Sequence, residues 1–221
     1  MIYFTYNIIY YIINMNMSQI TTQKGKDGEP NKKRKCFYYD NDKEKPILAA
    51  GVLFVKEENG KKYVLMQKKK EKEKQDEYSD FGGKIDIKDQ TAVETIAREL
   101  GEELNYGFYD STKSEKIYLD TTKELKRLIQ ENIIKKIYQE RAKYFIIIAK
   151  LPENISLDFE RIGNSEKLDK INRTVEWIDY EQFLKLYNGT KKTPNQIHPR
   201  LWGRQILGFF SPRKFGFSKS S

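Results

Sequence analysis

The sequence predicts an α/β fold, because strand-like and helix-like segments alternate along the chain. Two apolar runs, Pro46–Lys56 and Lys62–Lys68, flank the dipeptide Asn59–Gly60, and Asn-Gly between apolar runs is a strong signal for a β-hairpin. An amphipathic helix is expected after Thr91, and a buried strand over Lys143–Leu151, which is rich in β-branched and aromatic residues. We therefore expect a sheet packed against helices.

Four later elements complete the expected fold. A second helix is predicted over residues 121–140, with apolar side chains at helical spacing. Its other face carries Lys123, Lys126, Arg127, Lys135 and Lys136, which form either a ridge that binds phosphates or a plain solvent-exposed face. A strand over Thr174–Ile178 should precede a short helix at Asp179–Tyr187, and a last amphipathic helix is expected over His198–Phe210.

The ends of the chain differ in composition from its middle. Residues 1–14 are apolar and uncharged, but they fall short of the roughly 20 residues that a membrane span needs. Either a start codon misplaced upstream, a flexible tail or a functional anchor would account for them. We expect residues 1–35 to be an apolar segment and a basic linker without fixed structure, 36–212 to be the folded domain, and 213–221 to be a basic tail.

Composition limits the chemistry that the chain can perform. Cys36 is the only cysteine and His198 the only histidine, so an internal disulfide and a Cys/His zinc cluster are excluded, and Ser-His-Asp or Cys-His catalysis has little scope. Carboxylates with a hard metal ion remain. The net charge of +9, with a pI near 9.3, favours a polyanionic substrate, although lysine-rich surfaces also arise from solubility or biased genomes.

Acidic side chains gather on one edge of the helix that follows Thr91. Glu99, Glu102 and Glu103 span an arc of about 100°, at roughly 100° per residue, beside an apolar stripe that would face the core. That stripe consists of Val93, Ile96, Ala97, Leu100 and Leu104. Thr91 and Glu94 have the spacing of an N-terminal capping box. Such crowded carboxylates favour a divalent cation such as Mg²⁺ or Mn²⁺.

The segment from Gly82 to Tyr106 resembles the signature box of the Nudix hydrolases. The residues that match its second half are Arg98, Glu99, Leu100, Glu102, Glu103 and Tyr106. Counting back from Arg98, Gln90 stands in the slot of the first glutamate, Asn105 replaces the final glycine, and Gly83 is one residue too far upstream. Asn tolerates the left-handed conformation at a helix C-terminus.

These departures leave two expectations about the turn before the helix. Glu94, four residues before Arg98, could replace the missing glutamate as an ion-pair partner. The extra residue should fall in the turn between Lys84 and Asp89, where insertions cost little. The metal-binding half of the box is intact.

The resemblance implies a Nudix-like α/β/α sandwich with a mixed sheet, here with an inserted basic helix, and hydrolysis of a diphosphate linkage in a nucleoside diphosphate derivative. It implies one or more Mg²⁺ or Mn²⁺ ions, held by Glu99, Glu102, Glu103 and the Gly83 carbonyl. Glu99, Glu103 and Arg98 would be catalytic. A general base outside the box is the other reading, with Glu140, Asp158 and Glu160 as unranked candidates.

The substrate is expected to be capped RNA or another polyphosphorylated molecule. The leading hypothesis is removal of the 5′ cap of mRNA with release of m7GDP; the substrate-binding candidates are Lys68, Lys84, Lys126 and Arg127. Two alternatives stay open: a hydrolase of diphosphoinositol polyphosphates or small dinucleotides, and a non-catalytic Nudix-like RNA-binding module. We expect an intracellular, cytoplasmic location without stable membrane association, and the sequence leaves the oligomeric state open.

Overall fold

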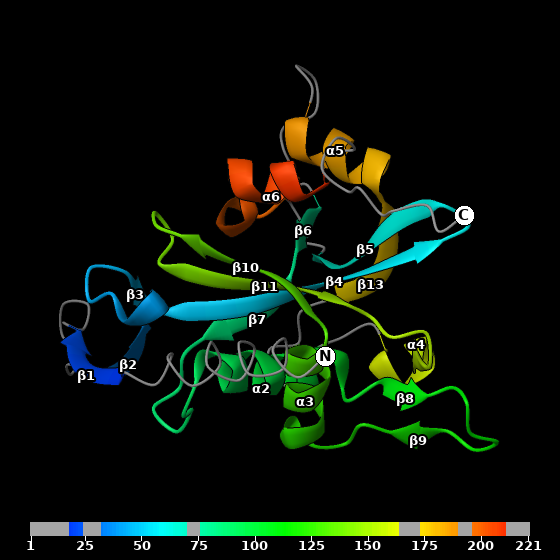
Figure 1. Ribbon diagram of the computed structural model, residues 1–221, viewed down its shortest axis with the longest axis horizontal. Coiled ribbons are helices and arrows are strands. Elements are labelled where there is room, and N and C mark those ends of the chain that lie inside the picture. Colours follow the sequence, from blue (N-terminus) through cyan, green and yellow to red (C-terminus); the bar gives the residue numbers. More distant parts are fainter. Residues whose placement is uncertain (1–17, 24–31, 70–75, 164–172, 190–195, 211–221) are drawn as a thin grey trace, which may run out of the picture.

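A computed structural model describes residues 18–23, 32–69, 76–163, 173–189 and 196–210. The apolar segment 1–14 and the basic tail 213–221 lie outside these residues. In Figure 1, helices α2 (Ala92–Leu104) and α3 (Thr122–Glu131) lie on one side of a central sheet, and α5 (Tyr180–Asn188) and α6 (Arg204–Phe210) lie on the other. The predicted α/β/α arrangement is therefore confirmed.

The central sheet is mixed, because one of its strand pairs is parallel and the others are antiparallel. Its strands pair in the order β10-β11-β4-β5-β13, and β7 and β6 add to β4 and β5 respectively. Only β11 and β4 run parallel. The strand bounds are β4 Ala49–Glu58, β5 Lys61–Lys69, β6 Glu77–Ser79, β7 Phe81–Lys84, β10 Ile133–Gln139, β11 Tyr144–Lys150 and β13 Arg173–Asp179.

Two small sheets and three short helical turns flank the central sheet. One small sheet contains β1 (Ser18–Gln23), β2 (Lys32–Tyr38) and β3 (Pro46–Ile47), and the other contains β8 (Phe108–Asp110), β9 (Ile117–Tyr118) and β12 (Ile155–Leu157). The short turns are η1 (Tyr39–Asn41), α4 (Phe159–Ile162) and η2 (Pro199–Leu201). No helix among the described residues combines the length and apolar character needed to cross a membrane.

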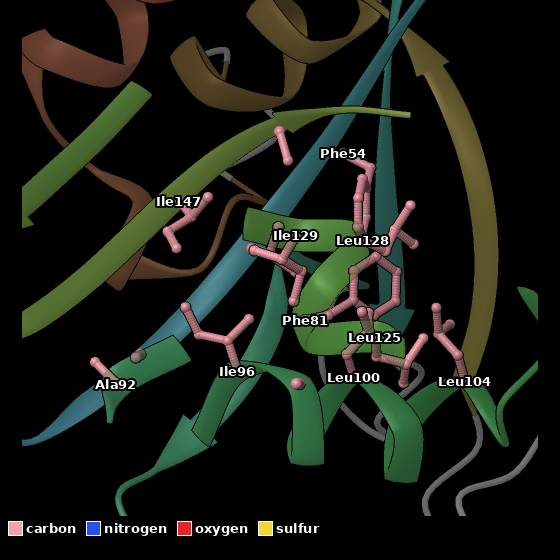
Figure 2. Packing of buried hydrophobic residues seen from close by; sticks show 14 of the residues in the cluster. Phe54, Phe81, Ala92, Ile96, Leu100, Leu104, Leu125, Leu128, Ile129 and Ile147 are labelled. Atoms are coloured by element: carbon pink, nitrogen blue, oxygen red, sulfur yellow. The ribbon is translucent and has the colours of Figure 1, made fainter. Parts of the chain in front are cut away.

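Two hydrophobic clusters fill the two sides of the sheet. Side chains of α2 and α3 pack on Phe54, Phe81 and Ile147 of the sheet, as Figure 2 shows. The second cluster lies under α5 and α6 and includes Leu53 and Phe183. Because Leu53 and Phe54 are neighbours in one strand, they point to opposite faces, and both are fully buried. The sheet thus separates two independent layers of side chains.

The predicted hairpin and helix ends are confirmed in detail. Asn59 and Gly60 both have positive φ, at 52° and 72°, as a tight Asn-Gly turn requires. The Thr91 side chain accepts a hydrogen bond from the Glu94 backbone N–H and so caps α2. At the other end, Asn105 is left-handed, with φ 49° and ψ 36°. Asn59–Gly60 therefore forms the turn between β4 and β5, and Thr91 and Asn105 define the two ends of the acidic helix.

The prediction of a helix over residues 121–140 is wrong for the second half of that segment. Helix α3 ends at Glu131, and Ile133–Gln139 forms β10, which pairs antiparallel with β11. Isoleucines at positions 133, 134 and 137 suit a strand, and pairing with the buried β11 gives their backbone groups partners. The proposed lysine ridge is consequently divided, because Lys135 and Lys136 lie on a strand while Lys123, Lys126 and Arg127 lie on a helix.

Two further boundaries differ from the sequence prediction. Strands β1 and β2 form within the expected linker, because buried Cys36, Phe37 and Tyr38 anchor the end of β2 and its backbone pairs with β1. The last helix is broken into η2 and α6 at Trp202–Gly203. There the Trp202 indole N–H donates to the Ile197 carbonyl and the Gly203 N–H donates to the Tyr187 hydroxyl.

The left-handed end of α2 yields a stability prediction. Asn105→Ala should lower the free energy of unfolding by about 1–2 kcal/mol, because alanine pays for the left-handed conformation and the bond from Asn105 Nδ2 to the Arg161 carbonyl is lost. Asn105→Gly should cost less, since glycine adopts this conformation freely. Urea unfolding of both variants measures the difference. Equal losses would show that the backbone conformation contributes nothing.

Candidate active site

The diglycine strand β7 and the end of helix α2 meet at Glu103. The Gly82 backbone N–H donates to Glu103 Oε2 at 2.9 Å. The other oxygen, Oε1, accepts from Gln67 Nε2 at 3.1 Å and from Arg173 Nη1 at 2.7 Å. Only 5% of the Glu103 side chain is exposed. The carboxylate is thus held by three donors from three separate strands.

Glu99 lies against the second glycine of the pair. A Cβ added to Gly83 would stand 2.3 Å from the Glu99 carboxyl carbon, far inside van der Waals contact. Glycine at position 83 is therefore what allows the helix to bring this carboxylate onto the strand. Burial raises the pKa of Glu99, although the neighbouring Arg98 charge opposes the rise.

Arg98 ties the acidic edge of the helix to the preceding turn. Its Nη1 donates to Glu99 Oε1 at 2.9 Å and to Glu102 Oε2 at 3.3 Å. Its Nη2 donates to the Lys84 carbonyl and to Asp89 Oδ2, and its Nε to Asp89 Oδ1. The planar guanidinium therefore fixes the positions of three carboxylates at once.

Asp89 is the carboxylate partner of Arg98, which corrects the expectation placed on Glu94. Asp89 is 6% exposed and also accepts a bond from the Thr95 hydroxyl. Glu94 instead pairs with Lys126 and accepts from the Gln90 N–H. Asp89 stands six residues after Gly83, which is the spacing of the box's first glutamate, so the extra residue lies between Asp89 and Arg98 rather than before Asp89.

The environment of Glu103 opposes its ionisation and supports it at the same time. Burial raises the pKa of the Glu103 carboxyl to about 7, while Arg173, Gln67 and Arg200 pull it back toward its ordinary value. A buried carboxylate loses its hydration and therefore needs a cation or hydrogen-bond donors beside it. Glu103 therefore depends on a neighbouring cation, which Arg173 supplies in this structure.

A second polar cluster lies next to the diglycine, on the face of the sheet that α5 and α6 cover. Asp80 is fully buried and accepts from Arg200 Nε at 2.6 Å and from the Tyr144 hydroxyl at 2.9 Å. Arg200 Nη2 also donates to the Asp80 carbonyl. A Cβ on Gly51 would lie within 2.2 Å of both the Tyr144 hydroxyl and the Asp80 carboxylate. This cluster packs against β7 on the face opposite helix α2.

Lys68, expected to bind substrate, points away from the acidic helix. Successive side chains of a strand face opposite sides, and Gln67, which contacts Glu103, lies on the helix α2 side. Lys68 pairs with Asp76 at 2.7 Å and lies over the Tyr78 ring, on the opposite side. Lys69, two residues after Gln67, lies on the helix α2 side instead; it is half-buried, and burial together with the Arg173 charge lowers its pKa.

The other three candidates for substrate binding, Lys126, Arg127 and Lys84, differ in their exposure and in their partners. Lys126 is held by Glu94 at 2.7 Å and so joins α3 to α2, which leaves it engaged in a structural ion pair. Arg127 is exposed on α3, and Lys84 is exposed at the end of β7, where its carbonyl accepts from Arg98. Among these three residues, Lys84 is the one whose backbone is joined to the acidic helix by a hydrogen bond.

The candidate bases outside the box have other surroundings. Asp158 caps α4 and accepts from Lys116 Nζ and the Tyr118 hydroxyl, and these bonds hold the pKa of its carboxyl well below the usual range. Glu160 is exposed in the first turn of α4, and Glu140 is exposed in the turn after β10. A strongly acidic Asp158 is a poor proton acceptor.

The oxygen ligands fit a hard divalent ion in chemistry, but not in their present arrangement. Carboxylates are the donors such ions prefer, but the Glu99 carboxylate itself fills the space that a Cβ at Gly83 would take. In the part of the chain that the structure describes, no three Asp, Glu, His or Cys side chains are grouped to hold one metal. Glu99 and Glu102 are turned to Arg98, and Glu103 to Arg173.

Comparison with known proteins gives a consistent result at the level of the family. The NUDIX domain model matches residues 45–200, which is most of the chain. A comparison with curated protein sequences gave no match. The matched region includes the diglycine, the whole acidic helix, Arg173 and Arg200, so the residues that form the site all lie within the family domain.

Several solved structures are similar at low identity. A binary complex of Ap4A hydrolase from C. elegans is 17% identical, with a TM-score of 0.35 over 62% of this chain and 83% of that one. The NUDIX domain of Shewanella oneidensis NrtR, complexed with ADP ribose, is 11% identical, with a TM-score of 0.34 over 67% and 77%. A NUDIX hydrolase from Nitrosomonas europaea is 11% identical, with a TM-score of 0.36 over 67% and 81%.

The two glycines should respond differently to an added methyl group. In Gly83→Ala the methyl meets only the end of the Glu99 side chain, which can swing aside, so activity should fall by about 10-fold or more while stability stays within about 1 kcal/mol. In Gly82→Ala it meets the Ala50 carbonyl and Gly51 Cα, so stability should fall by about 1–3 kcal/mol. Thermal melts and turnover assays separate the two effects.

Asp89 and Gln90 provide a second matched comparison. Asp89→Ala should lower the free energy of unfolding by about 1–3 kcal/mol, because Arg98 and Thr95 both lose a buried partner. Gln90→Ala should change it by less than about 0.5 kcal/mol, since the Gln90 side chain is exposed and bonds only to the Lys88 carbonyl. Chemical denaturation measures both. A larger loss in Gln90→Ala would contradict the assignment of Asp89.

Proposed function

We propose that this chain, which belongs to the NUDIX domain family, is a pyrophosphohydrolase that uses a divalent metal ion to hydrolyse a diphosphate linkage in a nucleoside diphosphate derivative. One observation carries this proposal: Glu99 and Glu103 both lie against the diglycine, with Arg98 joining Glu99 to Glu102. Such a concentration of oxygen ligands beside an open backbone suits a metal-bound diphosphate.

The chain's own residues would hold and orient the reacting groups. Glu99, Glu102, Glu103 and the Gly83 carbonyl are the proposed ligands of Mg²⁺ or Mn²⁺, which when bound would neutralise the diphosphate and acidify the attacking water. Arg98 orients Glu99 and Glu102 through charge-assisted hydrogen bonds. Glu103 is bonded instead to the Gly82 N–H and Arg173, and we propose it as the main ligand.

Glu99 is the residue we favour for accepting the proton from water. It is 18% exposed, compared with 5% for Glu103, so water reaches it more easily. Burial raises its pKa, which makes it a better proton acceptor than an ordinary surface glutamate. Asp158, whose pKa is lowered by Lys116 and Tyr118, is correspondingly less suited to this role.

Capped mRNA is the substrate that we propose first, with m7GDP as the released product. The net charge of +9 supports a long polyanion, since it favours association with nucleic acid. The exposed side chains of Lys84, Lys123 and Arg127 could contact an RNA body. Diphosphoinositol polyphosphates and small dinucleotides present the same diphosphate chemistry without such a body.

One assay distinguishes these substrates. Cap-labelled RNA, free cap analogue, a dinucleoside polyphosphate and a diphosphoinositol polyphosphate would each be incubated with the protein in Mg²⁺, Mn²⁺ or chelator, and the products identified. Release of m7GDP from RNA but not from free cap supports decapping. Turnover of a small substrate alone assigns the second reading, and RNA binding with steep salt dependence but no turnover contradicts the hydrolase proposal.

Glu103→Gln should reduce metal-dependent turnover by about 100-fold or more, because a neutral amide is a weak ligand for a hard cation. Glu94→Gln is the matched control: it removes a charge from the same helix, on a residue that pairs with Lys126 instead of facing the diglycine. Turnover of the control should remain near wild type. Circular dichroism would verify that both variants fold. Turnover at the wild-type rate in Glu103→Gln would contradict the assignment of Glu103 to the site.

A further inference from the structure

Arg173 forms an ion pair with Glu103, the carboxylate that the proposed function assigns to the metal. It begins β13 and lies on the same face as Val175 and Trp177, toward α2. Its Nη1 donates to Glu103 Oε1 and to Gln67 Oε1, both at 2.7 Å. The two side chains of the ion pair are only 9% and 5% exposed. A cation from outside the signature box therefore already neutralises its most buried glutamate.

This contact and a bound divalent ion would exclude one another. Glu103 Oε1 is the atom that Arg173 contacts, while Oε2 already accepts from the Gly82 N–H. A metal bonded to Oε1 would bring two cations to within a few ångströms of one another in a poorly hydrated site, where like charges repel strongly. Metal binding at Glu103 therefore requires the guanidinium to move away.

Lys69, the neighbour of Arg173 on β5, indicates what the guanidinium could bind after leaving Glu103. Arg173 and Lys69 are direct partners in the β13–β5 pairing, and like charges facing each other across a strand pair are destabilising. The Arg173 charge is among the causes that lower the pKa of Lys69, and the Glu103 charge acts against it. Two acids offset this repulsion: Glu103, which pairs with Arg173, and Glu77, which faces Lys69 in the β5–β6 pairing.

Arg200 also acts on Glu103 and Lys69 through its charge, but its own hydrogen bonds go to Asp80. Its Nε bonds to Asp80 Oδ1 at 2.6 Å, and its Nη2 bonds to the Asp80 carbonyl. Asp80 is fully buried on the other face of the sheet. Once the charge of Glu103 is committed to a metal, Arg173 and Lys69 together provide a doubly charged position for a new anion beside that metal.

We infer that Arg173 is a displaceable counter-ion of Glu103: a divalent metal takes its place on the carboxylate, and the released guanidinium binds the substrate's diphosphate together with Lys69. This inference rests on the proposed function and deepens it. It assigns Arg173 and Lys69 as substrate-binding residues and makes metal binding the event that prepares the phosphate site. A guanidinium is well suited to this exchange, since its planar fork fits carboxylate and phosphate oxygens alike.

Metal affinity is the first test, measured by titration of Mn²⁺ into the full chain without substrate. Arg173→Gln should bind Mn²⁺ about 5-fold or more tightly than wild type, because the competing cation is gone. Lys126→Gln is the matched control: it removes the other 2.7 Å ion pair made by a helix α2 glutamate and should leave the affinity unchanged. Equal or weaker Mn²⁺ binding by a folded Arg173→Gln protein would overturn the inference.

Phosphate binding is the second test, with inorganic pyrophosphate as the probe. In saturating Mn²⁺, both Arg173→Gln and Lys69→Gln should weaken pyrophosphate binding about 10-fold and raise the KM of the substrate more than they lower kcat. Lys69→Gln also covers the case in which Arg173→Gln does not fold, since it should leave Mn²⁺ affinity near the wild-type value. Unchanged pyrophosphate binding in Lys69→Gln would overturn the inference.

The failure of the inference is distinguishable from failure of the proposed function. If wild-type protein bound neither Mg²⁺ nor Mn²⁺, the metal-dependent hydrolysis itself would be contradicted. If wild-type protein bound Mn²⁺ and turned over substrate while Arg173→Gln did the same with unchanged constants, only the exchange at Glu103 would be wrong, and Arg173 would be a structural ion-pair partner.

Discussion

The contact between helix α2 and the diglycine of β7 determines most of what this site can do. A side chain at position 82 or 83 would overlap the strand β4 backbone or the Glu99 carboxylate. Because Gly83 has no Cβ, the helix can bring Glu99 against the strand, and in this position the Gly82 N–H donates to Glu103. The helix stays in this position because its apolar face is buried against the sheet and α3 (Figure 2). Hydrophobic packing thus provides the force that holds buried carboxylates in place.

The sequence predicts this contact well because its determinants are local. The cap at Thr91, the left-handed Asn105 and the spacing of the glutamates all lie within one helix, where geometry follows from sequence separation. The Asn59–Gly60 hairpin belongs to the same kind of prediction. In each case the residue types and their spacing are sufficient, and distant parts of the chain change little.

The parts of the site that the sequence does not reveal depend on pairing between distant residues. Arg173 is 70 residues from Glu103, and Arg200 is 120 residues from Asp80. No local pattern distinguishes these arginines from the many surface cations of the chain. The choice of Lys69 over Lys68 depends on strand register, where a shift of one residue exchanges the faces. The end of α3 depends on the buried strand β11, which offers residues 133–139 a pairing partner.

The positions of the cations also change how the positive charge of the protein relates to its substrate. The sequence suggests a basic ridge that is separate from the acidic site, but α3 ends before Lys135, and Lys126 is paired with Glu94. Among the described residues, Arg173 instead pairs directly with Glu103, and Lys69 and Arg200 act on it through their charges. They are half-buried or more, so salt screens them less than it screens an exposed ridge. Under the proposed function, attraction for a diphosphate group would come from these cations in the site itself, and any preference for an RNA body would come from other, exposed residues.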